Sequence, residues 1–210
     1  MKRYIFVLVI FIGSTQAFSQ AKVGLQLSPT ISSSRIETQS NTYSLKSDGA
    51  QLKFKFGLIA DFMLADNYYF STGLLYVPKQ VTLIATEEPN LRTLTEEYNL
   101  QYLQIPLTMK LYTNEITLDT RLFFNIGATA ELAISEKFDI DNEVIGDYKL
   151  FDSSLLLGAG VERNIGVNTA VYIAVVYNRG LINPIANALD IGQKIILKND
   201  MLSLDLGIKF

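Results

Sequence analysis

The sequence predicts an all-β protein: an antiparallel up-and-down transmembrane β-barrel of about eight strands. Three observations predict it. Eight segments of the chain have strand character, and in seven of them apolar and polar residues alternate. The connections between these segments are alternately long and short, and the last segment ends on Phe210 after a regular alternation.

The last segment, residues 201–210, shows the alternation most clearly. Its apolar residues are Leu202, Leu204, Leu206, Ile208 and Phe210, and the residues between them are Ser203, Asp205, Gly207 and Lys209. Because successive side chains of a strand point to opposite faces, one face is apolar and the other is polar or small. In a membrane barrel the apolar face contacts lipid, whereas in a soluble barrel it points inward. The alternation alone leaves both alternatives open.

Seven further segments have strand character: residues 22–35, 52–64, 68–84, 97–112, 120–134, 151–163 and 169–182. Six of them alternate in the same way, which assigns each side chain to a face. In residues 68–84 the consecutive apolar residues 74–77 (LLYV) leave the two faces ambiguous.

The connections distinguish a membrane barrel from a soluble one. The longer polar connections are residues 36–51, 85–96, 135–150 and about 183–194, and the shorter ones are 65–67, 113–119 and 164–168. Outer-membrane barrels have short periplasmic turns and longer external loops. We therefore expect periplasmic termini and outward-facing loops. Aromatic residues near the predicted periplasmic strand ends suggest a girdle at the membrane interface: Tyr68, Tyr69, Phe70, Tyr112, Phe123, Tyr172 and Phe210.

The first 19 residues have the pattern of a cleaved signal peptide. Lys2 and Arg3 precede an apolar stretch at residues 4–13, which is too short to span a bilayer as a helix. Ala17 and Ser19 favour cleavage after Ser19, and cleavage after Ala17 is the alternative. We expect residues 20–210 to form one outer-membrane β-barrel domain.

The composition excludes several classes of function. The chain has no cysteine and no histidine, so it lacks a thiolate nucleophile, a Cys-based metal site and the usual general base. Without Lys2 and Arg3, the 18 basic residues become 16 against 21 acidic ones, a net charge of −5. This balance argues against a nucleic-acid partner. We expect no enzymatic activity and no cofactor.

The predicted lumen face collects charges of both signs: Lys53, Lys55, Asp61, Lys110, Glu131, Glu162, Asp205 and Lys209. A ligand or ion site is one interpretation. A paired network is favoured, because eight strands leave an interior just wide enough for side chains and buried charges must pair. Residues 139–147 contain acidic groups of the kind that bind Ca²⁺, but a solvated loop is favoured there, and we expect no metal site.

Residues 102–112 (YLQIPLTMKLY) resemble a strand of the small outer-membrane β-barrel proteins of Bacteroidetes-type bacteria, a family that includes PorT-like proteins. Residues 73–79, 158–162 and 177–181, Asn183 and the strand ending in Phe210 are also similar, in matching order. Gln104 replaces the usual acidic residue, and the usual glycine after Lys79 is missing. The resemblance implies a barrel in the bacterial outer membrane, with Phe210 as an assembly signal read by the barrel-assembly machinery. It implies no catalytic residues.

Several functions remain open at this point. The first is a non-enzymatic outer-membrane barrel with a structural or partner-binding role, whose partners are outer-membrane lipid, the barrel-assembly machinery and secretion or surface proteins. The alternatives are a PorT-like component of protein secretion and a soluble lipocalin-like barrel that binds a small apolar ligand. Burial of Leu204 and Leu206 inside the barrel would favour the soluble alternative.

Overall fold

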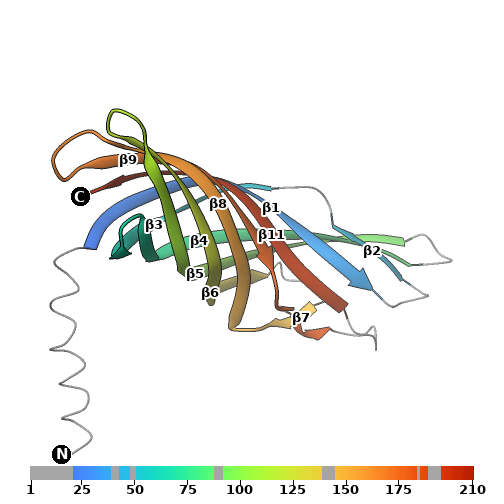
Figure 1. The fold of residues 1–210 in the computed structure, drawn as a ribbon. Helices are drawn as coiled ribbons and strands as arrows, with labels where there is room; N and C mark the ends of the chain where they lie inside the picture. Colours follow the sequence, from blue (N-terminus) through green and yellow to red (C-terminus); the bar gives the residue numbers. More distant parts are fainter. Residues whose placement is uncertain are drawn as a thin grey trace, which may run out of the picture.

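Eight long strands form the body of the molecule in the computed structural model, which describes residues 21–38, 43–47, 51–87, 92–138, 145–183, 185–188 and 195–210 (Figure 1). They are β1 (Ala21–Thr38), β3 (Gln51–Ala65), β4 (Tyr68–Glu87), β5 (Arg92–Thr117), β6 (Thr120–Phe138), β8 (Phe151–Asn164), β9 (Ala170–Gly180) and β11 (Ile195–Lys209). Three short strands, β2 (Tyr43–Ser47), β7 (Ile145–Tyr148) and β10 (Ile185–Ala188), accompany them. Among the described residues, no helix has the length and apolarity needed to cross a membrane.

The eight long strands close into an antiparallel up-and-down barrel, as the sequence predicts. Each of them pairs with the long strand that precedes it and the one that follows it, and β1 pairs with β11 to complete the ring. The closing pair is in register from Gly24, opposite Lys209, to Thr38, opposite Ile195. Backbone hydrogen bonds between Val23 and Phe210 extend this pair. The described strands of the barrel therefore have no unpaired edge along their shared length.

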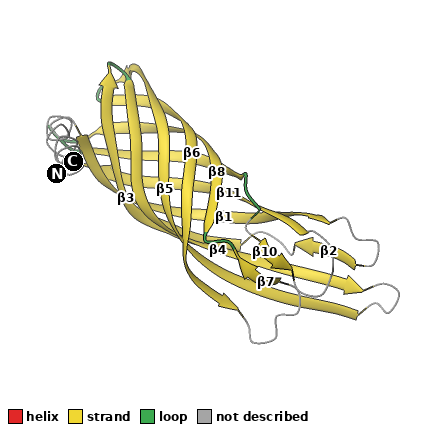
Figure 2. Cartoon of the chain, turned by 90° about the horizontal axis from the view of Figure 1, so that it is seen from below, coloured by secondary structure: helices red, strands yellow, loops and turns green. Residues whose placement is uncertain are grey.

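Short turns connect the strands at the end of the barrel that holds the C-terminus, which we call the turn end (Figure 2). Asp66 and Asn67 connect β3 to β4, and Leu118 and Asp119 connect β5 to β6. Asn67 and Asp119 have φ angles of 67° and 58°. This left-handed conformation suits tight hairpin turns, and asparagine and aspartate adopt it more readily than most residues. We call the opposite end, where β2, β7 and β10 lie, the loop end.

The apolar faces of the strands point out of the barrel. In β1, Leu25 is 54% exposed, whereas its neighbour Gln26 is 8% exposed. In β11, Leu204 and Leu206 are each 39% exposed, whereas Asp205 is 7% exposed. The soluble lipocalin-like alternative requires the reverse arrangement. Exposed apolar residues on β1 run from Val23 to Ile31, close to the ~9–11 residues with which a tilted strand crosses a bilayer.

The strands are longer at the loop end than the sequence analysis predicts. β5 has 26 residues and β4 has 20, and both continue into the range 85–96 that was expected to be a loop. Paired positions here include Thr86 with Thr93 and Glu87 with Arg92. Threonine favours strands because it is β-branched, although its polarity suggests a loop. At the turn end, β5 extends to Thr117, so the predicted connection 113–119 shrinks to two residues.

Candidate functional site

Among the residues whose burial the structure describes, nine charged side chains in the lumen are at most 7% exposed. They are Lys55, Lys79, Lys110 and Lys209, with Asp61, Glu131, Asp152, Glu162 and Asp205. All of them lie on the polar face of a strand, and this face points into the lumen because successive side chains of a strand point to opposite sides. Because isolated buried charges are strongly unfavourable, their pairing decides whether the lumen is stable.

A turn-side cluster consists of Asp61, Lys110, Tyr112, Glu162 and Lys209, contributed by β3, β5, β8 and β11. The Asp61 carboxylate accepts hydrogen bonds from the ammonium groups of Lys110, at 2.9 Å, and Lys209, at 2.6 Å. Lys209 also donates to Glu162, and the Tyr112 hydroxyl donates to the same Glu162 oxygen at 2.6 Å. Arg121 approaches the other Glu162 oxygen at 3.5 Å. Each carboxylate of this cluster therefore contacts two cations.

A loop-side cluster consists of Lys79, Gln104, Thr129, Glu131 and Asp152. The Lys79 ammonium group contacts Glu131 and lies 3.2 Å from a carboxylate oxygen of Asp152. The side-chain amide of Gln104 donates to Glu131 at 2.6 Å, and the Thr129 hydroxyl donates to the same oxygen at 3.1 Å. One cation therefore lies between two carboxylates, in contrast to the turn-side cluster.

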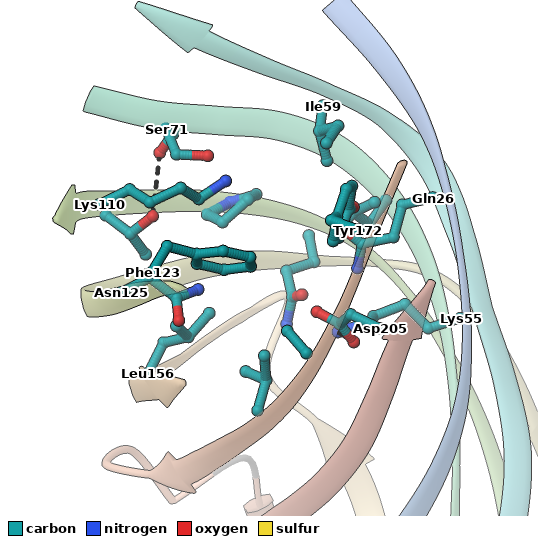
Figure 3. A pocket seen from close by; sticks show the side chains of 16 residues that line it. Gln26, Lys55, Ile59, Ser71, Lys110, Phe123, Asn125, Leu156, Tyr172 and Asp205 are labelled. Carbon is teal, nitrogen blue, oxygen red and sulfur yellow. Dashed lines mark hydrogen bonds and ion pairs between the residues drawn. The ribbon is translucent and has the colours of Figure 1, made fainter. Parts of the chain in front are cut away.

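Between the two clusters lies a cavity of about 40 Å³, with Lys55 and Asp205 on its wall (Figure 3). The ammonium group of Lys55 lies 3.4 Å from the Asp205 carboxylate, which also accepts a hydrogen bond from Ser203 at 2.7 Å. Across the cavity, Figure 3 shows Lys110 beside Phe123. A cavity of this size holds a few water molecules, whereas small-molecule sites usually enclose ~300–1,000 Å³.

An aromatic layer fills the lumen around the turn-side cluster. Phe123 is 1% exposed and lies next to Tyr112 and Tyr172, with ring centroids 5.6 and 6.1 Å away. Tyr69 contacts Tyr112 from the other side at 5.1 Å. The Lys209 ammonium group lies 4.8 Å from the centre of the Tyr172 ring, a favourable position for a cation over an aromatic face. Gly207, directly opposite Tyr172, leaves room for this ring.

The prediction of an external girdle is therefore wrong for four of its residues: Tyr69, Tyr112, Phe123 and Tyr172. Their positions on the polar faces direct them into the lumen, and closeness to a strand end does not change this direction. Tyr68 and Phe210, which are 51% and 59% exposed, do lie on the outer surface near the turn end.

The fold and the apolar outer surface agree with comparisons of the chain against known families. The family described as "Outer membrane protein beta-barrel domain" matches residues 15–185. The chain belongs to this family. It is accordingly a protein of the bacterial outer membrane.

The chain is also similar to solved outer-membrane barrels, of which OprG shares its fold. The outer membrane protein OprG from Pseudomonas aeruginosa is 15% identical, with 91% of this chain and 96% of OprG covered at a TM-score of 0.59. Neisserial surface protein A is 13% identical, with 90% and 96% covered at a TM-score of 0.49. AlkL, determined in lipid bilayers, is 15% identical, with 89% and 90% covered at a TM-score of 0.42. No curated protein sequence matches the chain.

In this outer-membrane barrel, seven of the eight charged residues singled out from the sequence are buried in the lumen: Lys55, Asp61, Lys110, Glu131, Glu162, Asp205 and Lys209. Five of them belong to the two clusters, and Lys55 and Asp205 form the pair on the wall of the cavity. The eighth, Lys53, is half-buried and forms no ion pair within the described part of the chain. Phe210 lies outside the barrel wall, and its role as an assembly signal stays a prediction.

Two lumen charges, Lys79 and Asp152, are absent from the set predicted from the sequence. Lys79 lies in the segment whose faces residues 74–77 left ambiguous. In β4 the inward positions are Leu75 and Val77, 3% and 1% exposed, and extending this alternation by two residues places Lys79 inside. Asp152 lies in β8, within the predicted strand 151–163, on the same inward face as Ser154 and Glu162, but it was not counted among the predicted lumen charges. The sequence does hold a signal for Lys79. Glu131 was predicted to lie in the lumen, where a buried carboxylate needs a cation beside it.

The described residues of the family barrel include no group of three or more acidic side chains arranged to hold a metal ion. Of the acidic stretch 139–147, residues 139–144 lie outside the described residues. The buried charges contact one another, which favours a closed and rigid lumen.

Proposed function

We propose that this chain is a non-enzymatic outer-membrane barrel with a closed lumen, a structural or partner-binding role, periplasmic termini and external loops. Residues 1–19 direct its export in this proposal and lie outside the described residues. Its partners are outer-membrane lipid, the barrel-assembly machinery and proteins that contact the loop end, and no nucleic acid is involved.

The packing of the lumen carries this proposal. Salt bridges connect β4 to β6 and β8 on the loop side. On the turn side they connect β3 to β5 and β11, and β11 to β8. These contacts cross the interior, and the cavity between them has a volume of only about 40 Å³. A diffusion pore needs a continuous aqueous channel, which is typical of barrels with about 16 strands or more.

The chemistry of the side chains supports a non-enzymatic role. The chain has neither histidine nor cysteine to act as base or nucleophile. The buried carboxylates Asp61, Glu131 and Glu162 each contact at least one lysine, so their oxygens are already engaged. No buried group is then left to activate a water or a substrate among those in the two clusters.

Single-channel recording of the purified full chain in a planar lipid bilayer tests the closed lumen. We expect no steps above the baseline at moderate voltage, because the ion pairs occupy the interior. A simultaneous recording from a known porin verifies that the bilayer detects conducting barrels. A stable, voltage-independent conductance from every inserted molecule would contradict the proposal.

The proposed orientation is tested separately by cysteine labelling in whole cells, since the natural chain has no cysteine. One variant, Asn90→Cys, places a cysteine between β4 and β5 in the sequence, and the other, Leu118→Cys, places it in the tight turn between β5 and β6. We expect a membrane-impermeant maleimide to label Asn90→Cys and to label Leu118→Cys only after permeabilisation. The opposite pattern would reverse the orientation without affecting the closed lumen.

A PorT-like role in protein secretion is a second candidate. The resemblance of residues 102–112 to a strand of the PorT-like, Bacteroidetes-type barrels supports it. Deleting the gene should then cause secreted proteins to accumulate in the periplasm, and the wild-type gene should restore their secretion. Normal secretion in the deletion strain would leave the structural or partner-binding role as the proposal.

A further inference from the structure

A group of charged residues lies on the outer surface of the barrel at the loop end, on β1, β9 and β11. Arg35 pairs with Lys198 across β1 and β11, and Asp200 pairs with Arg179 across β11 and β9. Lys198 and Asp200 are two positions apart on one strand, so the four residues share a face. Arg179 is exposed, and Lys198 and Arg35 are half-buried. We call these four residues the rim patch.

The rim patch borders the apolar outer surface directly. The next outward position on β11 toward the turn end is Leu202, 47% exposed, and on β9 it is Tyr177, 40% exposed. Two residues of a strand span about 7 Å, so the charged groups lie just beyond the hydrocarbon region. This is the depth at which lipid head groups lie and at which tyrosine is favoured.

The charge of the rim patch is predominantly positive. Arg35 and Asp200 form an ion pair at 2.6 Å, and Asp200 also accepts hydrogen bonds from the Gly180 amide and the Tyr177 hydroxyl. Asp200 is thereby occupied, and its carboxylate holds Arg35 against the wall. Arg179 and Lys198 form no ion pair within the described part of the chain. The next acidic residue on β1, Glu37, follows two positions beyond Arg35.

Among the described side chains, those of β4 and β5 at the loop end do not show this arrangement. On β4 and β5 the outward positions beyond the apolar surface are Gln80, Asn99 and Gln101, which are neutral. Both regions border the same apolar surface, and neutral polar side chains are sufficient to end that surface on β4 and β5. The positive charge of the rim patch therefore needs another explanation. The difference indicates a ligand with negative charge on the β1, β9 and β11 side.

We infer that the rim patch binds the phosphate of a membrane lipid head group, with the acyl chains of that lipid lying on the apolar surface below it. Arg179 and Lys198 contact the phosphate, Arg35 adds positive charge beside them, and Tyr177 marks the interface. The choice of leaflet rests on the proposed function, because the proposed orientation places the rim patch in the outer leaflet of the membrane. The binding itself depends only on the patch.

The test measures lipid binding by the full chain, folded in neutral detergent micelles, using native mass spectrometry. The probe is lipid A, a glycolipid with two phosphates, and the comparison is the same lipid after enzymatic removal of the phosphates. We expect the double variant Arg179→Gln with Lys198→Gln to bind lipid A about tenfold more weakly than the wild type. Both proteins should bind the dephosphorylated lipid equally weakly.

Two further variants serve as controls. Arg163→Gln removes one exposed positive charge from β8 at the turn end and should leave lipid A binding unchanged. Arg179→Lys with Lys198→Arg keeps both charges and should bind within about threefold of the wild type. If the double variant fails to fold, its two single variants replace it, and each should lose about threefold.

Three results would overturn the inference. They are equal lipid A binding by the wild type and the Arg179 and Lys198 variants, an equal loss in Arg163→Gln, and competition by millimolar inorganic phosphate, which would indicate a site for the free ion. A conducting lumen or a reversed labelling pattern would contradict the proposed function instead. The micelle measurement would be unaffected by either.

Discussion

In the loop-side cluster one ammonium group, that of Lys79, contacts two carboxylates, whereas in the turn-side cluster Asp61 contacts two ammonium groups. Both clusters lie in the same lumen and are buried to a similar degree. They differ in how many partners remain when one member is removed. Redundancy of partners, rather than burial, should therefore determine how much each lysine contributes to stability.

The largest effect is expected for Lys79→Met. This change leaves Glu131 and Asp152 buried with no cation between them, and breaking a buried pair in this way costs about 3–5 kcal/mol. Urea unfolding in lipid vesicles, followed by far-UV circular dichroism, measures the loss. Adding Glu131→Gln should recover part of it, because one of the two stranded charges is removed. A loss below about 1 kcal/mol would show that the loop-side cluster is hydrated.

Lys209→Met should have an intermediate effect of about 2–3 kcal/mol. Lys209 connects Asp61 to Glu162, but Asp61 keeps Lys110, and Glu162 keeps Tyr112 and Arg121. The same unfolding measurement compares it with Lys79→Met. If Lys209→Met were the more destabilising variant, redundancy of partners would not explain the difference between the clusters.

A smaller loss, about 1–2 kcal/mol, is expected for Lys110→Met. Asp61 then still accepts hydrogen bonds from Lys209 and from the Ser71 hydroxyl. A double-mutant cycle with Lys209→Met sharpens the comparison. The two changes together should cost more than the sum of the single changes, since Asp61 loses both cations only in the double variant. Additive losses would indicate that the two lysines act independently.

The smallest effect, about 1 kcal/mol, is expected for Tyr112→Phe. It removes the hydroxyl that donates to Glu162 but keeps the ring that packs against Phe123 and Tyr69. Tyr112→Leu removes the ring contacts as well and should cost about 2 kcal/mol more. Equal unfolding midpoints for the two variants would mean that the aromatic layer contributes little to stability.

The sequence was sufficient for the fold and for most of the lumen because both follow from the two-residue period of a strand. Asp61, Glu131 and Lys209 lie at inward positions that the alternation identifies without any tertiary information. The pairing of these charges was not predictable, because it depends on the stagger between strands. Lys79 and Glu131, for example, lie on strands that are not neighbours and meet only across the interior.

Strand length was the other limit. Threonines such as Thr86 and Thr93 are polar, and a pattern based on hydrophobicity assigns them to a loop. In the structure β4 and β5 continue as a paired ribbon, because the backbone hydrogen bonds of a hairpin need no apolar face. Only the pairing partner of each residue distinguishes such a ribbon from a loop.

The position of Lys209 on the closing strand has a consequence for the order of folding. Seven of the eight strand pairings join consecutive long strands and can form locally, but the β1–β11 pairing joins residues as far apart as Gly24 and Lys209. Lys209 reaches Asp61 on β3 across this closing pair, whereas Glu162 on β8 lies on its own side of the seam, two strands away. The ion pair between Lys209 and Asp61 therefore forms together with ring closure, and it joins the Asp61–Lys110 pair to the Lys209–Glu162 pair at that step. Long-range pairing of this kind is slow in general. Because the Lys209–Asp61 ion pair forms late, it should slow the separation of β1 from β11 during unfolding more than it speeds their pairing during folding.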